Sequence, residues 1–180
     1  MHGIVSILDA PNFTRVESVW RNLETVCGLK GVYITPVPHF SWQIAENYDL
    51  QRLETIIGEI ASSNAPFPAR ASGLALFTGE KPVAYLPIVR DARLSELHAQ
   101  IWQGSENIGD NLSPYYAPQA WMPHITIAYG DVNHQSMPCL MEHLAFQELN
   151  FEFQVDNLTF VFQPAEQVGL VIKKFTLGGR

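Results

Sequence analysis

Two short stretches of the chain place a histidine two positions before a hydroxyl residue: "HFSW" at 39–42 and "HITI" at 124–127. In each stretch the hydroxyl residue lies between apolar neighbours. Short motifs have a high false-positive rate, but about 0.13 such matches are expected by chance, so two would arise in roughly one sequence in a hundred of this composition. A third match, at His134, has polar Gln135 in its centre and is typical of a turn before a helix. The first two stretches are therefore the candidates for chemistry.

Both stretches alternate polar and apolar residues, as strands with one buried face do. His39, Ser41 and Gln43 are predicted on one face of their strand, and His124 and Thr126 on one face of the other. If the two strands meet, two imidazoles and two hydroxyls surround one space, which suits a phosphate diester. One neutral imidazole can take a proton from water while the other, protonated, gives one to the departing oxygen. The hydroxyls would donate to the phosphate oxygens. Gln43 either contacts the ligand or only follows the polarity of the strand.

The elements that must position these residues follow the same order in both halves: strand, helix, motif strand, helix, strand. For the first helix, the sequence predicts a capping box of Thr14 and Glu17 and an end at Gly28. Asp49 and Asp91 are expected to cap the next two long helices, and residues 67–79 are expected to form a strand. This layout predicts an α+β fold and a single domain of two pseudosymmetric, intertwined lobes, roughly 1–80 and 81–180. Each lobe is expected to hold an antiparallel or mixed sheet with helices on its outer side. The two sheets would face each other across a central cleft.

A long connection, "SENIGDNLSPYYAPQA", precedes the second motif strand. It exceeds the usual length of a connection, which is typical of binding loops. Tyr115, Tyr116 and, just after the loop, Trp121 can either stack on a nucleobase or pack inside the protein.

Composition excludes several classes of function. Eleven Lys and Arg against eighteen Asp and Glu give a net charge of −7, which argues against binding long nucleic acid through its phosphates. Cys27 and Cys139 lie in separate predicted helices without metal-type spacing, which predicts two free thiols and a reducing compartment. The sequence shows no signal peptide and no apolar run of the roughly 18 residues that a membrane span needs. We therefore expect a cytoplasmic monomer.

At the two motifs the chain resembles the two-histidine (2H) phosphoesterase superfamily, which includes LigT-like 2′-5′ RNA ligases and cyclic nucleotide phosphodiesterases. Further similarity at "PF", "GLALF", "SELHAQI" and "PHITIA" extends the resemblance over nearly the whole chain. The resemblance implies His39 and His124 as catalytic residues and Ser41 and Thr126 as phosphate-binding residues, with Ser41 replacing the commoner threonine. Gln43 and Tyr129 are further candidates for substrate binding. Some relatives carry a basic residue just after the second motif, where this chain has "AYG".

By this resemblance the activity would be hydrolysis of a cyclic phosphodiester, such as a 2′,3′-cyclic nucleotide or an RNA-terminal cyclic phosphate, to a 2′-phosphate. Family precedent favours His124 as the base and His39 as the acid. We expect neither a metal nor a cofactor, and a small nucleotide or short RNA end as the partner. Two alternatives remain open: a module that binds a nucleotide or RNA end without turnover, and an RNA 2′-5′ ligase or end-processing enzyme. The ligase would favour a basic rim that this composition hardly provides.

Overall fold

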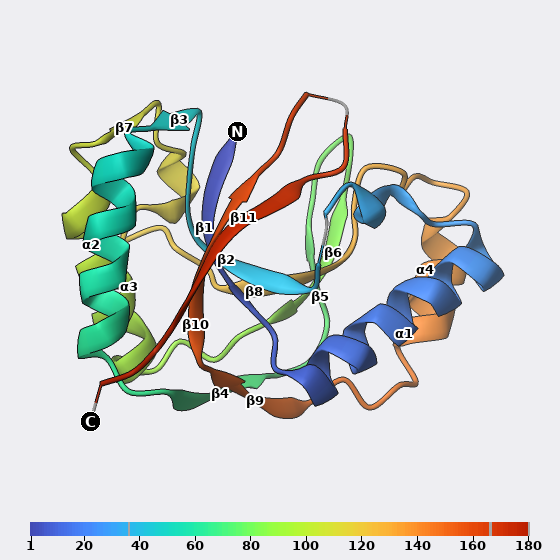
Figure 1. Cartoon of the computed structure of the whole chain (residues 1–180). Coiled ribbons are helices and arrows are strands. Elements are labelled where there is room, and N and C mark those ends of the chain that lie inside the picture. Colours follow the sequence, from blue (N-terminus) through green and yellow to red (C-terminus); the bar gives the residue numbers. More distant parts are fainter. Residues whose placement is uncertain (36, 166, 180) are drawn as a thin grey trace.

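A seven-stranded antiparallel sheet, in the order β11-β10-β1-β2-β8-β6-β5, runs through the protein (Figure 1). The structure is a computed structural model that describes residues 1–35, 37–165 and 167–179. The strands of this sheet are β1 (His2–Ile7), β2 (His39–Ala45), β5 (Ala75–Phe77), β6 (Val83–Pro87), β8 (His124–Ala128), β10 (Asn157–Phe162) and β11 (Leu170–Thr176). Two small sheets pair β3 (Asn47–Tyr48) with β7 (Gly109–Asp110) and β4 (Phe67–Ala71) with β9 (Phe151–Val155). The helices are α1 (Ala10–Cys27), α2 (Leu50–Ser63), α3 (Ala92–Ser105), α4 (Met137–Leu144) and the 3₁₀ turns η1 (Gly31–Ile34) and η2 (Pro114–Tyr116).

The α+β fold class with antiparallel sheets is confirmed, but the two lobes are the two halves of one sheet. They join where β2 and β8 pair through Phe40 and Ile125. The lobes also exchange strands, because β5 pairs with β6 of the second half while β10 pairs with β1 of the first. Helices α2 and α3 pack together beside one lobe and α1 and α4 beside the other (Figure 1). The expected two separate sheets are therefore replaced by one sheet with two halves.

The register of the strands reveals the internal duplication that the motifs suggest. In the first half Ile7 lies opposite His39, and in the second half Pro87 lies opposite His124. The strand beside the motif strand thus shifts by 80 residues between the halves (87 − 7), and the motif strand shifts by 85 (124 − 39). From Ile4 to Ile7, each residue pair between β1 and β2 has a counterpart between β6 and β8 that is related to it by the same two shifts. Each motif strand is therefore held by an equivalent neighbour in an equivalent register.

Helix starts are set by aspartate caps, which accept backbone N–H groups that have no partner inside the helix. Helix α1 begins at Ala10, where Asp9 accepts from the backbone of Asn12 at 3.2 Å. The predicted capping box is wrong, since Thr14 lies inside the helix and bonds the carbonyl of Ala10. The predicted end of this helix at Gly28 is confirmed, with a positive φ of 71°.

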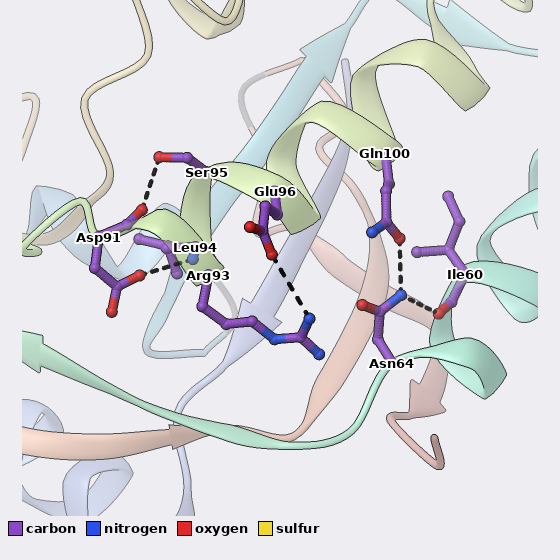
Figure 2. A network of polar contacts seen from close by, with 8 residues as sticks. All are labelled: Ile60, Asn64, Asp91, Arg93, Leu94, Ser95, Glu96 and Gln100. Atoms are coloured by element: carbon purple, nitrogen blue, oxygen red, sulfur yellow. Dashed lines mark hydrogen bonds and ion pairs between the residues drawn. The ribbon is translucent and has the colours of Figure 1, made fainter. Parts of the chain in front are cut away.

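The predicted caps of the next two long helices are also confirmed. The side chain of Asp49 accepts from the backbone of Arg52 at the start of α2. That of Asp91 accepts from the backbone of Leu94 at the start of α3, as Figure 2 shows. At the end of α2, Asn64 donates to Gln100 of α3 at 2.8 Å, which joins the two helices on this side of the sheet.

The predicted strand over 67–79 is two strands in two different sheets. Strand β4 pairs with β9, whereas β5 pairs with β6 at the edge of the large sheet. Gly73 lies between them with a φ of +81°, a conformation that residues with a Cβ rarely adopt. The chain turns there, and β5 consequently reaches the second motif.

Cys27 and Cys139 form a disulfide that joins the end of α1 to α4, so the prediction of two free thiols is wrong. The two residues are 112 positions apart, and only the packing of α1 against α4 brings their Cα atoms to 5.7 Å. The cysteines therefore give no support to the predicted cytoplasmic location, because disulfides persist mainly in oxidising compartments. Among the described residues, no helix is both long and apolar enough to cross a bilayer.

Removing this disulfide is expected to destabilise the protein without moving the motifs. A bond that closes so long a loop restricts the unfolded chain, so Cys27→Ser with Cys139→Ser should lower the free energy of unfolding by about 2–4 kcal/mol. Urea unfolding under non-reducing conditions measures the change. A reductant should shift the parent curve and leave the double variant unchanged. A parent curve that is insensitive to reductant would contradict the bond.

Candidate active site

The two motifs meet at the centre of the sheet, where Phe40 and Ile125 pair. Both paired side chains are buried, at 1% and 0% exposure. Because side chains alternate along a strand, the neighbours of Phe40 in β2 and of Ile125 in β8 point to the opposite face of the sheet. That face, here called the motif face, carries His39, Ser41, His124 and Thr126, all half-buried. In the antiparallel register each histidine lies next to the hydroxyl residue of the other motif.

A β-bulge follows the hydroxyl residue in both motifs. Val5 pairs with Ser41 and Ile4 with Gln43, so Trp42 is the extra residue, and Ile127 takes the same place in the second motif. Such an extra residue reverses the alternation beyond it.

The prediction that Gln43 shares the face of His39 is consequently wrong. Gln43 is 0% exposed. Its side-chain oxygen accepts from the hydroxyls of Tyr48 at 2.7 Å and Ser105 at 2.6 Å, inside the protein. Ala128, the equivalent residue of the second motif, is 1% exposed. Tyr129 follows the end of β8 and is 47% exposed, and its predicted contact with substrate stays a prediction.

Both imidazoles are oriented by the same backbone contact. Nδ1 of His39 lies 2.8 Å from the carbonyl oxygen of Val37, and Nδ1 of His124 lies 2.8 Å from that of Met122. A carbonyl only accepts, so each Nδ1 carries the proton of this bond. The Nε2 of each ring is then the atom that is able to accept or release a proton.

Burial lowers the pKa of both imidazoles from its ordinary value. For His39, loss of solvent is the main cause, and the nearby His124 lowers the pKa further. For His124, loss of solvent alone is the lowering cause. The backbone bonds of the two rings work in the opposite direction. The interaction between the two histidines places them within electrostatic reach of each other.

At each bulge a buried tryptophan binds the carbonyl of the hydroxyl residue. The indole N–H of Trp121 donates to the carbonyl oxygen of Ser41 at 2.9 Å, and that of Trp20 donates to the carbonyl oxygen of Thr126 at 3.1 Å. Both tryptophans are almost fully buried, and each comes from the half of the chain opposite to the motif it contacts. A bulge disrupts the ladder locally, so these two bonds position the hydroxyl residues.

Trp121→Phe and Trp20→Phe are expected to lower the activity by more than their cost in stability explains. Each change removes one buried donor and leaves a carbonyl without its partner, which costs about 1–3 kcal/mol. We expect a lower kcat with little change in KM. Tyr48→Phe is the matched control, since it removes a buried 2.7 Å hydrogen bond that does not involve either motif carbonyl. Equal kcat in all three variants would refute a positioning role.

The long loop before β8 packs on α3, and its anchor is a buried histidine. His98 is 0% exposed and stacks on Trp121 with ring centroids 3.9 Å apart. Its Nε2 lies 3.0 Å from the carbonyl oxygen of Tyr116. Arg90 donates to the carbonyl oxygens of Trp121 and Pro118, at 2.9 and 2.7 Å. Trp121 therefore packs inside the protein rather than binding a base.

His98 is expected to make the protein acid-sensitive. Burial lowers the pKa of this imidazole to about 4 from 6.5, so between these values the unfolded chain binds a proton that the folded protein does not. The free energy of unfolding should therefore decrease as the pH is lowered from 6.5 to about 4, by about 3 kcal/mol in total. Below that range it should level off. Urea unfolding at several pH values tests this. His98→Gln should flatten the slope, and an unchanged slope would contradict the assignment.

The loop also brings Tyr116 to the first motif, whereas Tyr115 is 79% exposed. Burial raises the pKa of the Tyr116 hydroxyl, and its hydrogen bond with the Ser41 side chain opposes that rise. Tyr116 thus lies near Ser41 of the first motif.

Two further aromatic residues at the second motif have no signal in the sequence. The rings of Phe77 and Tyr85 lie 5.0 and 5.1 Å from that of His124 and stack on each other at 4.1 Å. Phe77 lies on β5 and Tyr85 on β6, and only the sheet order β8-β6-β5 reveals that these strands lie on the side of the second motif. The two rings form an apolar wall around the second imidazole.

The chain belongs to the 2′-5′ RNA ligase superfamily, whose family model matches residues 13–164. This membership confirms the resemblance to the 2H phosphoesterases and supports a phosphoesterase or ligase-like role. No curated protein sequence matches the chain significantly.

Solved structures show the same fold at low sequence identity. The protein TT0787 of Thermus thermophilus is 19% identical with a TM-score of 0.71, and the match covers 99% of this chain and 98% of that one. LigT of E. coli in apo form is 13% identical with a TM-score of 0.63, covering 98% and 96%. Usb1 of Kluyveromyces marxianus is 12% identical with a TM-score of 0.50, covering 98% and 97%.

Proposed function

We propose that the protein hydrolyses a 2′,3′-cyclic phosphodiester, on a nucleotide or a short RNA end, to a 2′-phosphomonoester. One imidazole removes a proton from water through Nε2, and the water oxygen forms a bond to phosphorus. The bond between phosphorus and O3′ breaks, and the other imidazole, protonated, delivers its proton to O3′. Ser41 and Thr126 donate hydrogen bonds to the phosphate oxygens that gain charge. The reaction consumes one water and needs no redox partner.

The observation that carries the proposal is the matched orientation of two histidines on one face of adjacent strands. Each ring uses Nδ1 for a backbone carbonyl, which leaves both Nε2 atoms for proton transfer. A histidine with a purely structural role needs no second histidine in a matching position. Here the match also includes the bulge and the indole N–H donor at each motif. Family precedent favours His124 as the base and His39 as the acid, and we include these roles in the proposal.

A small substrate fits the charge of the protein. The net charge of −7 disfavours a long RNA contact. LigT of E. coli has been determined in complex with 3′-AMP and with ATP, and its fold is that of this chain. We therefore propose a nucleotide or short RNA terminus as the substrate, bound by a monomer.

The decisive test incubates the purified protein, in EDTA, with each 2′,3′-cyclic nucleotide and separates the products by chromatography. Formation of the nucleoside 2′-phosphate is the expected result. Binding without product would identify a nucleotide-binding module instead, and joining of RNA ends would identify a ligase. Dependence on an added metal ion would refute the two-histidine mechanism.

A further inference from the structure

Tyr85 of β6 lies on the motif face, directly beside the second motif. It pairs with Thr126 in the antiparallel register of β6 and β8, and the side chains of such a pair project to the same face of a sheet with their Cβ atoms about 4.5–5.5 Å apart. On its other side Tyr85 pairs with Ala75 of β5, so Phe77, two residues further along β5, shares this face as well. Thr126, Tyr85 and Phe77 therefore border one region of the motif face.

The ring of Tyr85 is held between two other rings. Its centroid lies 4.1 Å from that of Phe77, with the two rings stacked at 23°. It lies 5.1 Å from the centroid of His124, in an edge-on arrangement at 61°. The residue is 8% exposed. Packing alone thus fixes the ring, and the position of its hydroxyl follows from the position of the ring.

The hydroxyl of Tyr85 is left unused within the protein. A buried tyrosine usually bonds its hydroxyl to a neighbour, as Tyr48 does with Gln43 at 2.7 Å. Among the residues that the structure describes, the Tyr85 hydroxyl has no such partner, and it is not one of the enclosed polar atoms without a hydrogen bond, such as Nε2 of Gln43. The ring is therefore buried while the hydroxyl still reaches solvent on the motif face. A fixed polar group at the end of an apolar wall is typical of a ligand contact.

The first motif has no counterpart of this hydroxyl. The shift of 80 residues that relates β1 to β6 places Val5 at the position equivalent to Tyr85, opposite Ser41. Val5 is 0% exposed and has no polar side-chain atom. The other paired positions of β5 and β6 on this face carry neither Lys nor Arg; they are Ala75, Phe77, Val83 and Pro87. The second motif therefore has one additional donor, which is a neutral phenol.

We propose that the hydroxyl of Tyr85 is a third donor to the reacting phosphate and contacts the non-bridging oxygen on the side of Thr126. This inference rests on the proposed function, because it needs the phosphate to lie between the two motifs. Ser41 and Thr126 each bind one non-bridging oxygen, and Tyr85 adds a second hydrogen bond to the oxygen that Thr126 binds. The phenol keeps its proton throughout. Its hydrogen bond strengthens as charge grows on that oxygen, so Tyr85 is a catalytic residue beside the two histidines.

Tyr85→Phe tests the donor, because it keeps the ring between Phe77 and His124 and removes only the hydroxyl. For a 2′,3′-cyclic nucleotide, kcat should fall by about 10- to 100-fold, the loss expected for one hydrogen bond to a charged group, with little change in KM. Tyr48→Phe is the matched control, since it removes a phenol hydroxyl inside the protein and should retain the parent kcat. An unchanged kcat in Tyr85→Phe would refute the third donor.

Sulfur substitution separates a direct contact from a general disturbance of His124. Each of the two diastereomers of a 2′,3′-cyclic phosphorothioate carries sulfur in place of one non-bridging oxygen, and sulfur is a weak acceptor of hydrogen bonds. Tyr85→Phe should lower kcat for the all-oxygen substrate and for one diastereomer. The other diastereomer, whose sulfur faces position 85, should react almost equally with parent and variant. An equal loss on all three substrates would contradict a contact with one oxygen.

Failure of the proposed function is distinguishable from failure of this inference. If the parent hydrolyses the cyclic nucleotide and Tyr85→Phe equals it, only the third donor is refuted. If the parent hydrolyses no cyclic phosphodiester, the proposed function fails, and calorimetry with adenosine 2′-monophosphate decides the contact. An affinity that Tyr85→Phe lowers by about 10-fold would support a phosphate contact. Equal affinities, or no binding to the parent, would refute it.

Discussion

Replacing either His39 or His124 with alanine is expected to lower kcat/KM for the cyclic phosphodiester by about 10²–10⁴-fold, the usual contribution of a general acid or base. Each imidazole handles a different proton, so loss of one leaves the other without its complement. The kcat/KM of the double variant should therefore be only slightly lower than that of the less active single variant. Both rings are half-buried, and among the described residues each makes a hydrogen bond only through Nδ1, so the changes should cost little stability.

The pH profile gives this prediction a second readout. The base must be neutral and the acid protonated, so the parent should show a bell-shaped dependence of kcat/KM on pH. Burial lowers the pKa of both imidazoles below 6.5, so the maximum should lie on the acid side of that value. The exposed His134 belongs to the rejected third match, and His134→Ala is the matched control. Full activity in a histidine variant of either motif, or a flat profile, would exclude acid–base catalysis by this pair.

Removing the two motif hydroxyls has the second largest expected effect. Ser41→Ala and Thr126→Val each delete one donor to the phosphate oxygens, and loss of such a donor reduces kcat by about 10²–10³-fold. Ser41→Thr keeps the hydroxyl and should retain most of the activity. The loss should appear in kcat more than in KM, because the oxygens gain charge in the transition state.

Thr25→Val controls for the threonine change, since Thr25 is an exposed residue of α1. If Ser41→Thr is as inactive as Ser41→Ala, the hydroxyl is not the group that matters at this position. In that case the backbone of the bulge, held by Trp121, would be the better explanation.

Much of the fold follows from local signals. The alternation predicts β2 and β8, the aspartates predict the starts of α2 and α3, and Gly28 predicts the end of α1. These features depend on residues a few positions apart, whose interactions a linear pattern contains. The repeated order of elements and the two motifs similarly indicate the 2H superfamily, and the family match confirms it.

Apart from the local capping box of Thr14 and Glu17, the errors concern contacts between distant parts of the chain. The bulge that turns Gln43 inward depends on how β1 pairs with β2, and the cysteine pair depends on α1 packing against α4. The pattern of β2 alone continues through Trp42 without a break, so nothing local signals the reversal. The tryptophans that bind the motif carbonyls are equally distant, with 106 and 80 positions between donor and acceptor.

The order of residues along the chain was thus sufficient for the superfamily, the positions of both motif strands, the starts of α2 and α3 and the end of α1. Tertiary structure alone decided which side chains share the motif face, which strands form each lobe and which rings surround His124. The reason is physical: propensities and caps act within a few residues, whereas register, bulges and the position of Tyr85 beside Thr126 arise only when separate segments pack.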